Sequence, residues 1–178
     1  VSYEGKILSP KRHQLILLHK PIGYLCSRAS QGGVPTIYAL LPQSLSHLKP
    51  VGRLDKDSSG LILLTNDGTF AHQMTHPSFY KIKRYLVTLD TPLAPLHQQM
   101  ISDFGVDLPD GHSQLTLTRQ YDGDNTRWIV EMSEGRNRQI RRTFAALGYT
   151  VTKLHRTDFG GYSLGDIKSG KWRELDIS

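Results

Sequence analysis

The chain has 178 residues, of which 38% are hydrophobic, so it can bury one good core but is short for two independent ones. Its single cysteine, Cys26, excludes an internal disulfide, and no Cys/His cluster has the spacing of a zinc site, so we expect no structural metal. No apolar run is long enough to span a bilayer, so we expect a cytoplasmic protein with no membrane segment. The net charge of +6 favours a polyanionic partner, although ordinary basic drift would produce the same value.

Short apolar segments alternate with turn residues along the chain, and no repeat or low-complexity tract interrupts them. The predicted strands, rich in β-branched, aromatic or leucine residues, are 15–19, 24–27, 61–65, 83–89, 114–119, 128–132, 151–155 and 172–176. The predicted helices are 36–41, 68–74, 93–104 and 137–147. Asp67 is expected to cap the second helix and Gly148 to end the fourth. Many short strands with few, dispersed helices predict an α+β fold with a largely antiparallel sheet.

The first eight residues read as the end of a preceding segment. The run Tyr3-Glu4-Gly5-Lys6 is typical of a hairpin, but the neighbouring sequence offers no partner strand for it. We therefore expect residues 1–8 to be the remnant of another domain and residues 9–178 to form one domain.

The segment 51–61, which reads Val-Gly-Arg-Leu-Asp-Lys-Asp-Ser-Ser-Gly-Leu, places carboxylates in a loop that runs into an apolar strand. Reactive side chains are often mounted on loops held by rigid strands. On these grounds alone Asp55 is more often a turn-capping residue than a nucleophile. Asp57 fits the turn role better, because its side chain can accept hydrogen bonds from the amides of residues 58–60.

Lys83-Arg84-Tyr85 begins the predicted strand 83–89. Side chains alternate between the faces of a strand, so Lys83 and Tyr85 share one face and Arg84 takes the other. A tyrosine at this place is usually explained by strand propensity and packing. It gains a functional meaning if its face looks into a pocket beside Asp55.

The segment 134–142, Glu-Gly-Arg-Asn-Arg-Gln-Ile-Arg-Arg, leads into the most amphipathic predicted helix. At about 100° per residue, Ile140 and Phe144 lie on one apolar stripe. Arg141 lies at the border of this stripe, from which it can reach a buried carboxylate. Arg138 and Arg142 lie on the far side, where solvent and RNA phosphate are equally expected contacts.

Basic residues also cluster around this helix, and we interpret the cluster as a phosphate-binding face. Its members are Arg136, Arg138, Arg141, Arg142, Lys153, His155 and Arg156.

Taken together, these segments resemble the pseudouridine synthases of the RsuA/RluB type. The matching motifs, in chain order, are His-Lys-Pro-Ile-Gly-Tyr at 19–24, Gly-Arg-Leu-Asp at 52–55, Gly-Leu-Ile-Leu-Leu-Thr-Asn-Asp-Gly at 60–68, Lys-x-Tyr at 83–85, the 134–142 run, Leu-His-Arg at 154–156, Gly-Gly at 160–161 and Gly-Lys-Trp-Arg at 170–173. One such motif would be weak, but several in the same order over nearly the whole chain are specific.

The resemblance implies a pseudouridine synthase-like α+β fold with an active-site cleft across the sheet. It implies that Asp55 is the catalytic aspartate, Tyr85 the active-site tyrosine and Arg141 the basic partner of the aspartate. Arg53 falls where the family contacts the opened RNA. The resemblance also implies a preceding S4-type RNA-binding domain, of which residues 1–8 would be the end.

The implied reaction isomerises a uridine of structured, ribosomal RNA in a monomeric enzyme that needs no cofactor. We expect the RNA contacts to come from Arg53, Lys83, Arg136, Arg138, Arg142 and Arg156. An ionised aspartate can act as the covalent catalyst by attacking C6 of the base or C1′ of the ribose. An adjacent arginine would keep a buried carboxylate charged, and Tyr85 would stack on the target base.

Two other readings are open at this point. In the first, the protein only binds RNA or assists ribosome assembly, and Asp55 is structural. In the second, it is a glycoside hydrolase or nucleosidase. That chemistry usually needs two carboxylates across the scissile bond, and the sequence offers no convincing second one.

Overall fold

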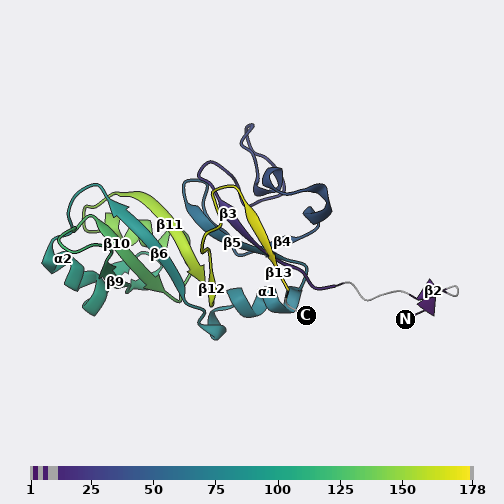
Figure 1. The fold of residues 1–178 in the computed structure, drawn as a ribbon. Helices are drawn as coiled ribbons and strands as arrows, with labels where there is room; N and C mark the ends of the chain where they lie inside the picture. The colour runs from purple at the N-terminus through teal and green to yellow at the C-terminus, as the bar shows by residue number, and fades with distance from the viewer. Residues whose placement is uncertain (1, 4–5, 8–11, 177–178) are drawn as a thin grey trace.

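The centre of the computed structural model, which describes residues 2–3, 6–7 and 12–176, is a nine-stranded sheet (Figure 1). Its strand order is β13-β3-β5-β11-β6-β10-β9, with β4 paired to β5 and β12 paired to β11. The strands are β3 (Leu15–Lys20), β4 (Lys49–Val51), β5 (Ser59–Thr65), β6 (Lys83–Leu89), β9 (Thr116–Arg119), β10 (Arg127–Met132), β11 (Val151–Phe159), β12 (Tyr162–Ser163) and β13 (Trp172–Leu175). All pairings are antiparallel except that of β5 with β11, so the expected α+β fold with a largely antiparallel sheet is confirmed.

Two short hairpins lie outside this sheet: β1 (Ser2–Tyr3) with β2 (Lys6–Ile7), and β7 (Val106–Leu108) with β8 (Gly111–Ser113). In the first, Tyr3 pairs with Lys6, so the expectation that this run lacks a partner strand is wrong. Residues 1, 4–5 and 8 lie outside the described part of the chain. The helices are α1 (Gly68–Thr75), α2 (Pro95–Gln99) and α3 (Gln139–Ala145), three 3₁₀ turns η1 (Ile37–Leu40), η2 (Gln43–Leu45) and η3 (Pro77–Phe79), and the π-helical turn η4 (Met100–Phe104). None of the helices in the described ranges is long and apolar enough to cross a membrane.

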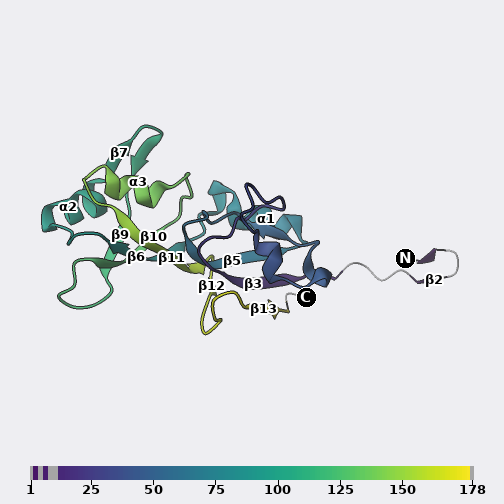
Figure 2. The ribbon, with the colours of Figure 1, turned by 90° about the horizontal axis from the view of Figure 1, so that it is seen from above.

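The sheet consists of two halves that meet at one narrow seam. The β5 half comprises β13, β3, β5 and β4, and the β11 half comprises β11, β12, β6, β10 and β9 (Figures 1 and 2). At the seam, β5 and β11 share only the pairs Ser59↔His155 and Gly60↔Arg156. Gly60 has φ +115°, and a Cβ atom there would lie 2.1 Å from the carbonyl oxygen of Arg156, so only glycine allows the two strands this approach.

The cores explain why the apolar strands have no polar face. Alternate residues of β3 point to opposite sides of the sheet: Ile16 and Leu18 join a core with Phe144 of α3, while Leu15 and Leu17 join a second core. The second core includes Met74 of α1 and the 164–167 segment. Both faces of the β5 half are therefore covered, which accounts for the seven buried residues in succession along β5.

Four sequence predictions need correction. The helix expected at 36–41 is only the 3₁₀ turn η1. The segment 24–27 is not a strand, because Leu25 forms only an isolated bridge with Thr36 and has no neighbouring strand to extend it. The predicted helix 93–104 changes at Met100 from the α-helical α2 to the π-helical η4. The predicted helix 137–147 begins only at Gln139, because Arg138 has a left-handed backbone (φ 50°).

Candidate active site

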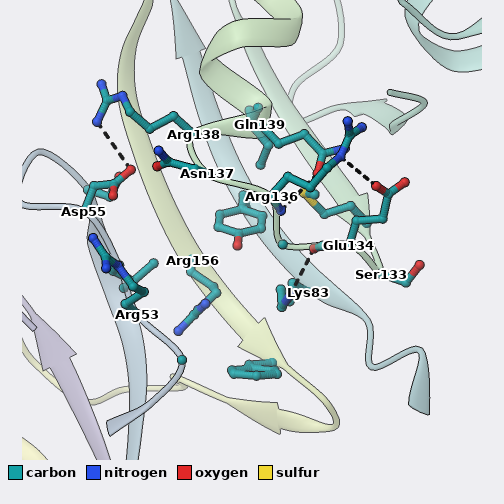
Figure 3. A pocket seen from close by; sticks show the side chains of 18 of the residues that line it. Arg53, Asp55, Lys83, Ser133, Glu134, Arg136, Asn137, Arg138, Gln139 and Arg156 are labelled. Carbon is teal, nitrogen blue, oxygen red and sulfur yellow. Dashed lines mark hydrogen bonds and ion pairs between the residues drawn. The ribbon is translucent and has the colours of Figure 1, made fainter. Parts of the chain in front are cut away.

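A pocket lies across the seam and takes its walls from both halves of the sheet (Figure 3). The loop 52–55 between β4 and β5 forms one wall. The segment 132–140, which runs from β10 into α3, forms the opposite wall, and side chains of β6 and β11 form the floor. Residues 75–80, between α1 and β6, contribute to its lip.

Asp55 projects from a turn at the edge of this pocket. The amide of Ser58 donates to the carbonyl of Asp55 over 3.0 Å, which closes the turn just before β5 begins. The Asp55 side chain is 24% exposed, so its carboxylate is partly withdrawn from water but accessible from the pocket. A carboxylate that a ligand can reach in this way could act as a nucleophile, and that role stays a prediction.

Lys20, which is 0% exposed, supports this turn from the interior of the protein. Its ammonium donates to the carbonyls of Asp55 and Ser58 over 3.0 and 2.7 Å, and to those of Pro21 and Lys56 over 3.1 and 3.4 Å. Burial lowers the pKa of Lys20, while the neighbouring Cys26, Asp55 and Asp57 oppose that shift. No sequence pattern indicates this role for a lysine at the end of a leucine-rich strand, so Lys20 was not among the predicted site residues.

Arg138, rather than Arg141, is the cation that pairs with Asp55. Its Nη1 lies 3.3 Å from the Asp55 carboxylate (Figure 3). Its two terminal nitrogens also form a bidentate pair with Asp57 at 3.1 and 2.9 Å. Arg138 was expected on the far side of a helix beginning at residue 137. The left-handed backbone at Arg138 breaks that periodicity and turns its side chain across the pocket.

Arg141 is close by but has other contacts. Its Nη1 donates to the carbonyl of Val151 over 3.1 Å, and its Nη2 donates to the carbonyl of Asp57 over 3.0 Å. Its ion pair is with the Asp57 carboxylate, at 3.6 Å. Arg141 therefore ties α3 to β11 and to the backbone of the Asp55 turn, and the expected Asp55–Arg141 pair is wrong.

Asp57 is also more than the turn cap that the sequence suggested. Its carboxylate receives the fork of Arg138, and this hydrogen bonding holds the pKa of Asp57 below its usual range. The carboxylates of Asp55 and Asp57 therefore both contact the guanidinium of Arg138, and Arg141 also contacts Asp57.

Tyr85 and Lys83 line the same pocket as Asp55, as their shared strand face predicted. Tyr85 is buried in β6 between Val130 of β10 and Arg156 of β11. The Lys83 ammonium donates to the carbonyl of Glu134 over 3.0 Å (Figure 3). Burial, reinforced by the charge of Arg156, lowers the pKa of Lys83 to about 8. Their catalytic and binding roles stay predictions.

Arg156 and Arg53 complete the cationic lining, but in different ways. Arg156 is 3% exposed, and its Nε donates to the carbonyl of Leu61 across the seam over 2.8 Å. Its guanidinium lies 4.8 Å from the centre of the Phe159 ring, and its Nη2 has no hydrogen-bond partner among the described residues. Arg53 is exposed beside Asp55 (Figure 3), and its expected RNA contact stays a prediction.

Two other predicted RNA contacts are engaged within the protein. Asp110, in the turn between β7 and β8, pairs with Arg136 at 3.0 Å and with Arg142 at 2.9 Å. Arg136 also pairs with Glu134 at 3.0 Å. These bonds fasten the β7–β8 hairpin to α3, so Arg142 serves the structure here and only Arg136 of the two lines the pocket. In the described ranges, no group of three or more His, Cys, Asp or Glu could hold a metal ion.

Comparison with known proteins identifies the family and the fold. Residues 14–146 match the sequence profile of the family described as RNA pseudouridylate synthase. An "Uncharacterized RNA pseudouridine synthase" of Aquifex aeolicus is 34% identical over 98% of this chain and 73% of the relative, and the "Ribosomal small subunit pseudouridine synthase A" of Escherichia coli K12 is 36% identical over 98% of this chain and 76% of the relative. The solved structure described as "Crystal structure of pseudouridylate synthase" superposes with a TM-score of 0.84 at 34% identity, over 93% of this chain and 71% of that one.

Proposed function

This chain belongs to the RNA pseudouridylate synthase family, and we propose that it isomerises one specific uridine of ribosomal RNA to pseudouridine with Asp55 as the nucleophile. The observation that carries the proposal is the Asp55 carboxylate, held 3.3 Å from Arg138 in the pocket that Tyr85 lines. The ribosomal substrate is supported by the relative from Escherichia coli, whose name states action on the small ribosomal subunit.

The reaction is an internal rearrangement and is balanced without a second substrate. The bond from C1′ to N1 breaks, the uracil turns, and C1′ joins C5. The proton on C5 then leaves, and N1 gains one. Asp55 supplies the covalent partner that holds one fragment while the base turns.

The other pocket residues have supporting roles in this proposal. Arg138 orients the Asp55 carboxylate through the contact from its Nη1, and a guanidinium has further N–H donors for a second carboxylate. Lys20 fixes the turn from which Asp55 projects. Tyr85, buried in the floor, offers its ring to the uracil. We propose that the enzyme acts as a monomer, since this chain by itself brings Asp55, Arg138 and Tyr85 to one pocket.

A uridine inside an RNA helix cannot reach Asp55, so the enzyme must flip it into the pocket. Arg53, exposed beside Asp55, is the residue placed to occupy the gap or to hold the opened strand. Arg156, Lys83 and Arg136 would then meet oxygens of the nucleotide. A preceding S4-type domain would add further affinity for the folded RNA.

The test is to incubate the protein with unmodified ribosomal RNA and map pseudouridine. We expect modification at one uridine, and its loss in Asp55→Asn with RNA affinity unchanged. Asp57→Asn is the matched control, because it removes a carboxylate from the same turn but not the nucleophile, and it should retain at least part of the activity. Binding without isomerisation would indicate a silent RNA-binding module, and release of free uracil would indicate a nucleosidase.

A further inference from the structure

The backbone of Tyr80 has a conformation that a tyrosine does not favour. Tyr80 ends the 3₁₀ turn η3 with φ 48° and ψ 46°, and its amide donates to the carbonyl of Pro77 over 3.2 Å. Glycine is the common residue at such left-handed caps, because a Cβ atom strains the conformation. Glycine would therefore form this cap with less strain. The presence of a tyrosine at position 80 must have a reason other than the cap.

The folded chain does not supply that explanation. The Tyr80 side chain is 72% exposed, and within the described residues its hydroxyl makes no hydrogen bond and its ring makes no aromatic or cation–π contact. Phe79 beside it is 45% exposed, with its ring packed edge-on against His72 and His76 at 6.0 and 6.3 Å. The strained turn therefore carries exposed aromatic rings that a binding partner from outside the chain could contact.

The location of Tyr80 indicates what that partner is. Tyr80 lines the same pocket as Asp55 and Lys83 while its ring remains in solvent, so it stands on the lip through which a nucleotide must pass. When a uridine leaves its stack, the neighbouring base loses a stacking partner. An aromatic ring beside the entrance can replace that partner, whatever the identity of the base.

We propose that Tyr80 stacks on the unpaired RNA base that flanks the flipped uridine. The inference rests on the proposed function, since it assumes that a nucleotide enters the pocket. In this proposal, residues 77–80 of the pocket lip contact single-stranded RNA. The neighbouring cations Arg53 and Lys83 suit the phosphates of that strand.

The experiment uses a single-stranded RNA nonamer of uridines in which 2-aminopurine replaces the residue on one side of the central uridine. Stacking on an aromatic ring quenches 2-aminopurine fluorescence. We expect quenching with the unaltered protein from one flanking position, and its loss with Tyr80→Gly together with about ten-fold weaker binding. Because glycine suits φ 48°, this variant should fold at least as stably.

Two control variants separate stacking from general loss of apolar surface. Tyr80→Phe keeps the ring and should keep both quenching and affinity. Phe104→Ala removes a comparably exposed ring, 67% exposed, that does not line the pocket, and it should change neither. An abasic residue at the quenched position should make the unaltered protein and Tyr80→Gly bind equally.

The outcomes also distinguish this proposal from the proposed function. Equal binding and equal quenching by Tyr80→Gly and the unaltered protein would overturn the stacking contact, even if ribosomal RNA is isomerised normally. Quenching that depends on Tyr80 in a protein that does not isomerise ribosomal RNA would support stacking and overturn only the reaction. Absence of quenching at either flanking position would assign the lip to a partner other than RNA and overturn the proposal.

Discussion

The carboxylate of Asp55 and the guanidinium of Arg138 lie 3.3 Å apart, although 83 positions separate the two residues in the sequence. Asp55 belongs to the loop before β5, and Arg138 belongs to the segment that enters α3. The pair therefore bridges the two halves of the sheet directly above their seam. It forms only when both halves are correctly placed.

The Asp55–Arg138 pair predicts which arginine matters most for turnover. Arg138→Ala should lower kcat on ribosomal RNA at least about ten-fold, because a charge-assisted contact that aims the nucleophile is lost. Arg142→Ala removes a neighbouring arginine that pairs with Asp110 instead, and it should leave kcat within about three-fold. Single-turnover rates at saturating protein measure both. Equal rates for the two variants would show that the pair has no part in catalysis.

The buried ammonium of Lys20 predicts a large effect on stability. Lys20→Met leaves the carbonyls that it holds without a donor and should lower the free energy of unfolding by about 3 kcal/mol. Lys49→Met changes an exposed lysine of β4 and should cost under about 0.5 kcal/mol. Urea denaturation gives both values. A Lys20→Met protein as stable as the control would mean that the turn does not depend on this lysine.

His155 predicts a loss of stability in mild acid. Its Nδ1 lies 2.8 Å from Oγ of Ser59, and burial, with the nearby charges of His19 and Lys153, lowers its pKa from 6.5 to about 4. Between these values the unfolded chain takes up a proton that the folded chain does not. Stability should therefore fall as the pH drops from about 6.5 to about 4, by up to about 3 kcal/mol.

The variant His155→Asn lacks this titration. Its unfolding free energy, followed by urea denaturation across the same pH range, should decline less steeply than that of the unaltered protein. Parallel curves would show that another group causes the acid sensitivity.

The exposed Arg53 predicts a change in the salt dependence of RNA binding. Each phosphate neutralised releases condensed counterions, so Arg53→Gln should reduce the slope of log affinity against log salt by about 0.7 to 0.9. Arg173 pairs with Asp166 at 2.6 Å and does not line the pocket, so Arg173→Gln should leave the slope unchanged. Affinities measured between about 50 and 200 mM salt test this. An unchanged slope for Arg53→Gln would remove this residue from the RNA contact.

The sequence predicted the strands best where burial imposes a clear pattern, as in β5, which is buried throughout, and β6, in which buried residues alternate with partly exposed ones. It could not find β4, β7, β8 and β12, which have two or three residues and owe their pairing to tertiary contacts. The segment 24–27 has a strand-like composition but no neighbour to pair with.

For the site, the motifs and the resemblance placed Asp55 and Tyr85 in one pocket correctly. They predicted that Arg141 pairs with Asp55, whereas Arg138 does. The positive φ of Arg138 delays the start of α3 and turns the Arg138 side chain toward Asp55. Lys20 was missed because its function depends on three carbonyls that the turn at 55–58 brings to it, beside that of Pro21. Such a cage has no signature in the residues themselves.

The narrow join between β5 and β11 has a consequence for how the protein tolerates mutation. A methyl group at position 60 would meet the carbonyl oxygen of Arg156, so Gly60→Ala would push the strands apart along the line where Asp55 faces Arg138. At other positions a substitution can lower stability without affecting catalysis, or affect catalysis without lowering stability. At position 60 a single carbon atom changes both together, so in a scan of all substitutions this glycine should tolerate no replacement, whether the selection is for soluble protein or for modified RNA.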